Sequence, residues 1–414
     1  MNQGSPSSKP LAGVRVLDLT QFLAGPYATM ILGDLGAEVI KVEPPQGDAT
    51  RTIPPNFVGD ESAYYLSINR NKRSIVVDLK KPQGRELVLR LAKASDIVIE
   101  NNRPGVVDRL GLGYAELSQA NPKIIWASIS GFGQDGPYRD YPAYDMIVQA
   151  LSGGMSLTGE AGRPAVRAGI PIGDLAAGMY SVIGILAALH ESKATGRGKR
   201  IDVAMLDCQV SMLCYQAAYY LASGKVPGPQ GREHESFATY RTFEAGDGVS
   251  VVVCANTEKM WQDMARILGL GELVDDERFR TNADRHVHRG ALGPLLDAAF
   301  LKRPAEAWVQ DFRQAGIPVG GVNKLDKALS NPHVLHRNMV VGMTDEAGHN
   351  VRVVGNPIKF SGELESAPTY PPRFGGDTRS VLSEVLGCSA QEIASLLADQ
   401  VVLERMAERS PISP

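Results

Sequence analysis

The chain has 414 residues, of which 43% are hydrophobic and 21% are charged, and its formal net charge is −3. This length exceeds one ordinary hydrophobic core, so we expect two domains, and the lack of long Lys or Arg runs argues against nucleic-acid binding. The four cysteines form no C-x-x-C pair, which gives no support to a metal site or a disulfide framework.

The first residues predict a disordered tail over 1–10, because Ser, Pro and Gly dominate "MNQGSPSSKP". This segment lacks the apolar core of a signal peptide, and no later stretch reaches about 18 uninterrupted apolar residues. We therefore expect a cytoplasmic protein with reduced thiols that neither binds nor crosses a membrane.

The following segments alternate between strand and helix patterns. The patterns predict strands at 14–20, 38–43, 73–79, 96–101 and 123–130, a glycine turn at 24–26, and helices at 27–36 and 82–95. Such βαβ alternation is typical of a parallel sheet covered by helices on both faces. The fold class is therefore α/β, with a Rossmann-like large domain over 11–221.

A Gly- and Pro-rich stretch at 222–236 predicts a linker. Beyond it, a strand at 248–256 and helices at 258–269, 292–302 and 304–316 predict a smaller α+β domain over 237–325. The last part, 326–414, contains a strand-like segment at 351–361 and an amphipathic helix at 390–402. Periodicity alone does not decide which domain this part joins.

The glycine loop after the strand at 123–130 has the spacing G-x-G-x-x-G, with Gly131, Gly133 and Gly136. A dinucleotide-binding loop needs a helix that begins at the third glycine. Pro137 and Pro142 disfavour that helix, so we expect neither NAD nor NADP to bind.

Asp174 precedes a run of helix-forming residues that extends to about His190. Asp is a preferred N-cap, and on position alone that structural interpretation is favoured. The same position would also suit a nucleophilic carboxylate at a helix N-terminus, flanked by Gly173 and Gly178 that would let a substrate approach closely.

Several segments together resemble the class III CoA-transferase family, also called CaiB/BaiF. They are "LAGVRVLDLTQFLAGPYATMILGDLGAEVIKVE", "NRNKRSIVVDLK", "GFGQDGP", "AGIPIGDLAAG", "TGRGKRIDVAMLD" and "GNPIKFSG". The resemblance implies two interlocked, ring-like chains in a homodimer, with 326–414 returning to the large domain. It also implies that Asp174 is the nucleophile, which forms an aspartyl anhydride and then an aspartyl-CoA thioester.

Coenzyme A is then a substrate, and no prosthetic group or metal is expected. The resemblance implies that CoA contacts residues in five segments, although each Lys or Arg among them could be only a solvated charge. These residues are Leu23, Ala24, Lys72, Arg73, Val77, Asp78, Lys80, Asn101, Asn102, Arg103, Arg109 and Tyr144.

The substrate class follows from softer similarities. The segments at 47–75 and 331–340 resemble transferases that move CoA from succinyl-CoA to dicarboxylates such as glutarate. Arg51 and Arg167 are candidates to bind a distal carboxylate, and Asp145 is a further candidate substrate contact.

Three departures from the family pattern are present. Leu23 replaces a glutamine of formyl transferases and their glycine-rich flap has no counterpart, which indicates a different acyl donor or a different way of covering the intermediate. In addition, "FGGDT" at 374–378 replaces Gly-x-His-Thr.

Two alternative functions stay open. One is a 2-methylacyl-CoA racemase, disfavoured because Tyr144 stands in the place of the racemase histidine. The other is a non-catalytic CoA-binding homologue, which would not need Asp174.

Overall fold

The computed structural model describes residues 9–361 and 367–404, so most of the predicted tail at 1–10 lies outside the described residues. The chain divides into two compact units. The first consists of the described parts of 1–154, 167–219 and 333–414, and the second of 155–166 and 220–332.

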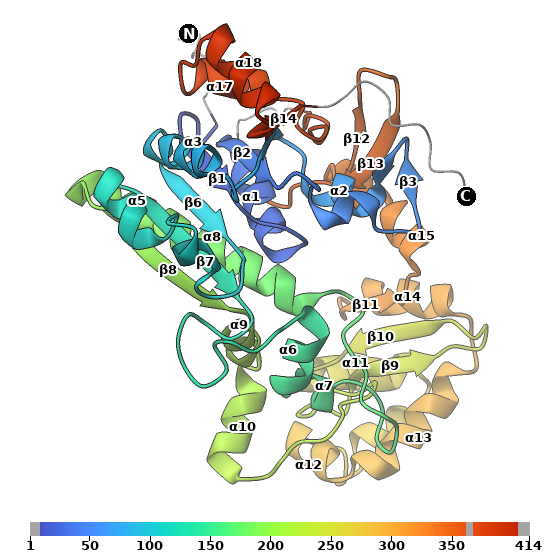
Figure 1. The fold of residues 1–414 in the computed structure, drawn as a ribbon. Helices are drawn as coiled ribbons and strands as arrows, with labels where there is room; N and C mark the ends of the chain where they lie inside the picture. Colours follow the sequence, from blue (N-terminus) through green and yellow to red (C-terminus); the bar gives the residue numbers. More distant parts are fainter. Residues whose placement is uncertain (1–8, 362–366, 405–414) are drawn as a thin grey trace, which may run out of the picture. The chain divides into compact units, whose positions relative to one another are not determined.

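The first unit is built on a seven-stranded sheet with the order β14-β5-β2-β1-β6-β7-β8 (Figure 1). All pairs are parallel except the antiparallel pair of β14 and β5. Without β14, this order is that of a doubly wound Rossmann sheet, in which the strand order reverses beside β1. The predicted α/β class with a large parallel sheet is confirmed. The strands are β1 (Arg15–Asp18), β2 (Glu38–Glu43), β5 (Lys72–Val77), β6 (Ile97–Glu100), β7 (Ile125–Ser130), β8 (Lys199–Ala204) and β14 (Val402–Leu403).

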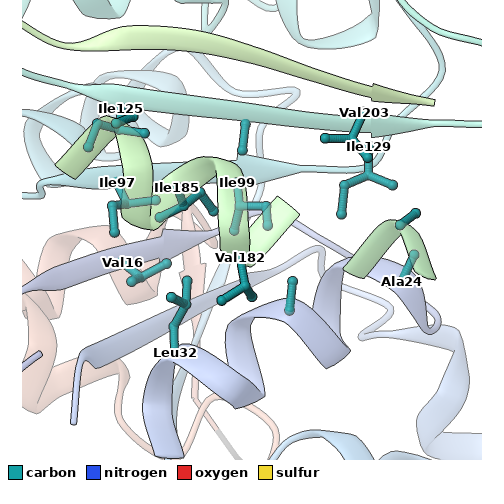
Figure 2. Packing of buried hydrophobic residues seen from close by; sticks show 14 of the residues in the cluster. Val16, Ala24, Leu32, Ile97, Ile99, Ile125, Ile129, Val182, Ile185 and Val203 are labelled. Atoms are coloured by element: carbon teal, nitrogen blue, oxygen red, sulfur yellow. The ribbon is translucent and has the colours of Figure 1, made fainter. Parts of the chain in front are cut away.

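Helices cover both faces of this sheet. Successive strand residues point to opposite sides, and both sets of side chains are apolar and buried. On one face, α1 (Ala24–Asp34) and α8 (Ile172–Thr195) bury Leu32, Val182 and Ile185 against strand residues such as Val16 and Ile97 (Figure 2). On the other face lie α3 (Pro82–Lys93), α5 (Tyr114–Ala120), α17 (Thr378–Glu384) and α18 (Ala390–Ala398).

The described C-terminal segment from residue 333 onward belongs to this first unit, whereas residues 326–332 of the predicted C-terminal part lie in the second unit. Helices α17 and α18, red in Figure 1, contribute Val381 and Ile393 to the core that contains Leu17 of β1. Strand β14 then pairs with β5, with Val402 opposite Val77.

Helix α8 is the one described helix that is long and apolar enough to cross a membrane by length and composition. Its small residues Ala176 and Ala177 and its branched residues Val182 and Ile185 are buried in the core of the parallel sheet. An apolar core helix of this kind meets the same test, so the composition of α8 follows from its packing.

The second unit contains a three-stranded antiparallel sheet of β9 (Tyr240–Glu244), β10 (Ser250–Cys254) and β11 (Val319–Gly321). Its core is aromatic: the rings of Phe243 and Phe300 stack at 4.1 Å, and Trp308 packs beside Phe300. The helices of this unit include α11 (Glu258–Ile267), α12 (Asn282–Val287), η2 (Gly271–Val274), α13 (Arg289–Phe300) and α14 (Ala305–Gln314).

Residues 155–166, which the sequence places in the large domain, belong to the second unit. Backbone hydrogen bonds explain this difference, because the Gln230 N–H donates to the Leu157 carbonyl and the Gly231 N–H to the Gly159 carbonyl. These bonds join segments that are distant in the chain.

Short elements complete the fold. They are η1 (Ala49–Thr52), β3 (Phe57–Val58), β4 (Glu61–Ser62), α2 (Ala63–Ile68), α4 (Val106–Arg109), α6 (Asp145–Leu151), α7 (Gly154–Leu157), α9 (Met205–Met212), α10 (Tyr215–Ser223), α15 (Leu325–Leu329), α16 (Pro332–His336), β12 (Val340–Thr344) and β13 (Asn350–Val354). The predicted turn at 24–26 lies inside α1, where Pro26 is tolerated because the first-turn N–H groups have no intrahelical partner.

Candidate active site

Asp174 lies in the first turn of α8, but it is not the N-cap. The helix begins at Ile172, the cap residue is Pro171, and no side chain caps the helix. The structural interpretation of Asp174 as a cap is therefore wrong. Its carboxylate instead accepts a hydrogen bond from the backbone N–H of Ala24, the first residue of α1.

The environment of Asp174 favours its neutral form. Burial raises the pKa of Asp174 and the charge of Asp145 raises it further, while the hydrogen bond from Ala24 lowers it in part; the resulting pKa is about 7. A carboxyl group that ionises near neutrality in a half-buried position is a candidate for catalysis.

The contact between α8 and α1 depends on Gly178. A Cβ atom at this position would lie 2.8 Å from the Ala24 carbonyl oxygen and 3.0 Å from Cδ1 of Tyr27. Gly178 thus allows two helices to approach closely, rather than a substrate as the sequence suggests. This close approach brings the N-terminus of α1 to the Asp174 side chain.

A second carboxylate, Asp145, is held beside the nucleophile candidate. Its Oδ1 accepts the Gly173 N–H at 2.7 Å, and its Oδ2 accepts Nε2 of Gln149 at 2.6 Å. Oε1 of Gln149 in turn accepts the Ala168 N–H at 2.9 Å. These hydrogen bonds therefore join α6, the loop at Ala168 and the start of α8 next to Asp174.

Tyr64 of α2 lies at this site and is not among the residues predicted from the sequence. Burial raises its pKa to about 12, and the charges of Asp174, Asp48 and Asp145 contribute to the rise. The phenol therefore stays protonated at neutral pH and is available as a hydrogen-bond donor near Asp174. No motif distinguishes Tyr64 in the sequence from the adjacent Tyr65, which is fully buried.

Two exposed aromatic rings lie at the same site. Phe22 has a positive φ of 63°, which is rare for a residue with a side chain. Its ring makes an edge contact with the ring of Tyr144 at 6.1 Å, and the two residues are 39% and 69% exposed. Leu23, between Phe22 and Ala24, is buried.

Buried charges support the loop that leads to α1. Asp18 accepts hydrogen bonds from Thr20 and Thr29, and its carboxylate lies 3.2 Å from Nζ of Lys72. Burial raises the pKa of Asp18, but Lys72, Lys41 and these hydrogen bonds outweigh it and lower the pKa to about 2. Nζ of Lys41 donates to the Thr20 carbonyl at 2.9 Å.

The predicted phosphate contacts Lys72 and Arg73 are both bound by groups of the protein itself. Nζ of Lys72 is engaged by Asp18, the Pro26 carbonyl and Asn69, and its side chain is fully buried. Arg73 donates to Glu38, Ser380 and Glu384. Both residues begin β5, whereas ligands of parallel sheets bind beyond the carboxyl ends of the strands.

Arg51 is likewise unavailable to a substrate. Its guanidinium is buried and donates to Glu43 at 2.6 Å and 2.8 Å, to Glu61 at 2.7 Å and to the Tyr65 hydroxyl at 2.6 Å. Arg167 is exposed, and its Nη1 donates only to the adjacent Ala168 carbonyl among the hydrogen bonds of the described residues. The structure thus separates the two candidate arginines.

A cavity opens at the carboxyl ends of four strands in the first unit. Val77 ends β5, and Asn102 follows β6, so two of the predicted CoA contacts line this cavity. The walls are otherwise largely apolar, and the remaining lining residues are Leu19, Gln21, Val42, Glu43, Pro44, Leu79, Val107, Leu110 and Leu112. The cavity lies where the strand order reverses, which is the usual ligand position in such sheets.

Asn101 bridges this reversal point. Its Oδ1 accepts the Gln21 N–H at 2.9 Å and its Nδ2 donates to the Gln21 carbonyl at 2.7 Å, which ties β6 to the segment after β1. Asn102 is fixed by its backbone N–H, which donates to Glu100 at 2.8 Å. Asn101 therefore shapes the cavity through the backbone.

Positive charge gathers near the cavity on exposed side chains. Lys80 follows β5, and its N–H donates to Asp78 at 2.9 Å. Arg109 approaches the left-handed turn at Gly105, whose Cβ would lie 3.2 Å from Nη1 of Arg109 and 3.6 Å from Nη2 of Arg139. Arg103 and Arg109 are among the predicted CoA contacts, whereas Arg139, which follows the glycine-rich loop, is not.

Two further features limit the chemistry. No helix begins at Gly136, because the first helix after β7 is α6 at Asp145, so the glycine loop lacks the helix that a pyrophosphate would need. Within the described ranges, no group of three His, Cys, Asp or Glu side chains could hold a metal ion, and all four cysteines are free.

Comparisons with known proteins give one family. The family model described as CoA-transferase family III matches residues 11–378. The human succinyl-CoA:glutarate CoA-transferase is 40% identical over 395 residues, covering 95% of this chain and 90% of the relative. The acetyl-CoA:oxalate CoA-transferase of Acetobacter aceti is 42% identical over 355 residues, covering 85% and 90%. A crystal structure of a CaiB/BaiF family protein from Brucella suis matches with a TM-score of 0.81 at 37% identity, covering 92% of this chain and 100% of that one.

Proposed function

The chain belongs to CoA-transferase family III, and is an enzyme of that type, and we propose that it moves CoA from succinyl-CoA to a dicarboxylic acid through Asp174. The observation that carries the proposal is the position of Asp174, which is half-buried, faces the N-terminus of α1 and is adjacent to a second carboxylate. A non-catalytic homologue would gain nothing from this destabilised carboxylate.

The proposed reaction has four acyl-transfer steps. A carboxylate oxygen of Asp174 attacks the thioester carbonyl of the donor, the C–S bond breaks, and a mixed anhydride and CoA thiolate form. The thiolate attacks the Asp174 carbonyl carbon, releases succinate and leaves an aspartyl-CoA thioester. The acceptor carboxylate attacks the same carbon and expels the thiolate, which attacks the acceptor acyl carbon of the new anhydride and regenerates Asp174.

Each step passes through a tetrahedral oxyanion, and the site contains two donors suited to it. The Ala24 N–H already donates to Asp174, and the Tyr64 phenol, with a pKa of about 12, remains protonated. Donors fixed in place before the reaction stabilise the developing charge without reorganisation. Asp145 raises the energy of ionised Asp174, which supports its attack on the thioester.

The cavity at the carboxyl ends of the strands supports CoA binding. We propose that its apolar walls, which include Val77 and Leu110, hold the adenine ring. Lys80, Arg109 and Arg139 supply positive charge for the phosphates.

We propose Arg167 as the partner of the distal carboxylate. Its guanidinium is exposed, and the adjacent Ala168 N–H donates to Gln149, which holds Asp145. The neighbouring loop is therefore anchored to the site. A planar guanidinium matches a carboxylate in a bidentate pair. The dicarboxylate class also agrees with the names of the relatives, which specify glutarate and oxalate.

We also propose the interlocked homodimer that the resemblance implies. Exposed apolar side chains gather on α6, α8, α9 and the start of α10 in the described chain, which is unusual for a monomer surface. They are Met146, Ile147, Leu151, Met179, Tyr180, Ile183, Val210, Met212, Tyr215 and Tyr219. Light scattering should give twice the chain mass of 44.5 kDa; a monomer at micromolar concentration would contradict the proposal.

The test of the function is a screen of carboxylic acids with succinyl-CoA as donor, read by mass spectrometry of the CoA products. We expect a new acyl-CoA with a dicarboxylic acceptor. Trapping with hydroxylamine should modify Asp174 only when the donor is present. If 2-methylacyl-CoA exchanges its α-proton in heavy water and no acid accepts CoA, the racemase alternative holds.

Arg167→Gln tests the acceptor contact. We expect its KM for a dicarboxylate to rise about tenfold or more, because the free energy of one lost charge-assisted hydrogen bond corresponds to a factor of this size. The KM for succinyl-CoA is the second readout. Arg337→Gln, at another exposed arginine of the first unit, is the matched control. Equal KM values in both variants would remove Arg167 from the site.

A further inference from the structure

Gln209 has a buried amide nitrogen without a hydrogen-bond partner beside the nucleophile. Gln209 lies on α9 and is 6% exposed. Among the described residues, no acceptor lies within hydrogen-bond geometry of its Nε2. A Cβ atom at Gly173, the residue before Asp174, would lie 2.5 Å from this nitrogen. Gly173 is thus required by the approach of Gln209.

The other end of the same amide is anchored. Oε1 of Gln209 accepts the Ser152 hydroxyl at 3.0 Å. This contact orients the amide so that its N–H groups face Gly173. The reverse orientation would turn an oxygen toward the region of the Asp145 carboxylate, because Oδ1 of Asp145 lies 3.0 Å from the same Gly173 Cβ position. Electrostatics therefore favour the donor on this side.

An unpaired buried donor is costly, so its retention points to an acceptor that it meets during the reaction. The nearest acceptor around Gly173 is Asp145, whose Oδ1 already accepts the Gly173 N–H at 2.7 Å. A small shift of Asp145 would give it this second donor.

We propose that Gln209 is a positioning residue of the acyl-transfer reaction, whose amide secures Asp145 and, through the Gly173 N–H, the turn that carries Asp174. The proposal rests on the function proposed above and adds a residue that does not touch the substrate. Gln209 acts through Asp145, so its loss should affect the rate of chemistry more than the binding of the donor.

The first test compares Gln209→Met, which keeps the volume and removes the donor, with Gln310→Met at an exposed site on α14. We expect Gln209→Met to lower kcat about tenfold, the effect of one lost buried donor, with KM for the donor acyl-CoA changed less than about twofold. Its melting temperature should stay equal or rise, because a buried unpaired N–H is removed. Ser152 keeps a partner, since its hydroxyl also lies 3.1 Å from the Gln149 carbonyl.

The kcat and the melting temperature of Gln209→Met, taken together, distinguish a positioning residue from a structural residue. A structural residue would lower the melting temperature and kcat together, and that result would overturn the proposal. Gln209→Glu is the second variant: it keeps the shape but turns an oxygen toward Asp145, so its kcat should fall below that of Gln209→Met. Equal kcat values in wild type and both variants would also overturn the proposal.

A double-mutant cycle with Asp145→Asn tests the route. If Gln209 acts through Asp145, Gln209→Met should cost about tenfold in kcat in the wild-type background and less than about twofold in Asp145→Asn. Additive effects would refute this route.

A measurement without turnover keeps this test independent of the proposed reaction. In the free protein the Gln209 amide nitrogen has no partner among the described residues, so hydrogen exchange at the Gly173 amide should be the same in wild type and in Gln209→Met. With succinyl-CoA bound, exchange at Gly173 should be about tenfold faster in Gln209→Met than in wild type, while the later turns of α8 stay unchanged. If the wild type transfers CoA to no acid, the proposed function fails. The exchange rates and the melting temperature then still decide the role of Gln209, and equal exchange with succinyl-CoA bound would reject it.

Discussion

Replacing Asp174 with asparagine should remove turnover and at the same time stabilise the protein above neutral pH. The ordinary pKa of an aspartate here is 3.8, and burial with the Asp145 charge raises it to about 7. Between these values the unfolded chain loses a proton that the folded protein keeps. Stability therefore falls as the pH rises through this window. The asparagine side chain of Asp174→Asn carries no charge and avoids this loss.

The magnitude follows from the pKa. A rise from 3.8 to about 7 corresponds to a cost of at most about 4 kcal/mol for ionising Asp174 in the folded protein. Asp174 is partly exposed, so solvent screening reduces this figure to about 2 kcal/mol. The oxygen of an asparagine can still accept the Ala24 N–H, and the fold should persist.

The assay compares melting temperatures of wild type and Asp174→Asn at pH 5 and pH 8. About three fifths of this cost falls above pH 5, so the advantage of the variant should grow by about 2 to 3 °C between the two, since 1 kcal/mol shifts the melting temperature of a large domain by about 2 °C. Asp326→Asn, at an exposed aspartate on α15, is the control and should show no such growth. An advantage that does not depend on pH would refute the assigned environment, and retained turnover would refute the nucleophile.

Four further outcomes are expected. The kcat/KM for the donor should rise with pH and reach half its maximum near pH 7, where Asp174 ionises; a flat profile from pH 5 to pH 9 would contradict this role. Lys72→Met should lower the free energy of unfolding by about 3 to 5 kcal/mol in denaturant titrations, because it leaves Asp18 charged and buried. Lys80→Met should keep wild-type stability but raise the KM for CoA thioesters in a salt-dependent way, and an unchanged KM would remove Lys80 from the phosphate site. Gly178→Ala should cost about 1 to 3 kcal/mol and most of the activity, because its Cβ would lie 2.8 Å from the Ala24 carbonyl oxygen; a neutral substitution would show that the helices can separate without loss.

Periodicity was sufficient for the parallel sheet, because buried strands and amphipathic helices produce local patterns. The predicted strand at 38–43 coincides with β2, and the predicted helix at 82–95 contains α3. The sequence patterns did not predict β8, whose segment "KRIDVA" opens with charged and exposed residues. They also did not predict that residues 155–166 belong to the second unit. Hydrogen bonds between distant segments decide that membership, and no local pattern reports them.

For the site, the sequence by itself determined which family the chain resembles and which aspartate is the candidate nucleophile, since both depend on short segments in a fixed order. Only the tertiary structure decided the use of each charged side chain. Lys72 and Arg51 look in the sequence like other basic residues of the region, yet both are buried against carboxylates, while Arg167 and Lys80 remain exposed. A charge becomes a ligand contact or an internal ion pair according to the burial that surrounds it and the acids that distant segments place next to it, and neither quantity is local in the chain.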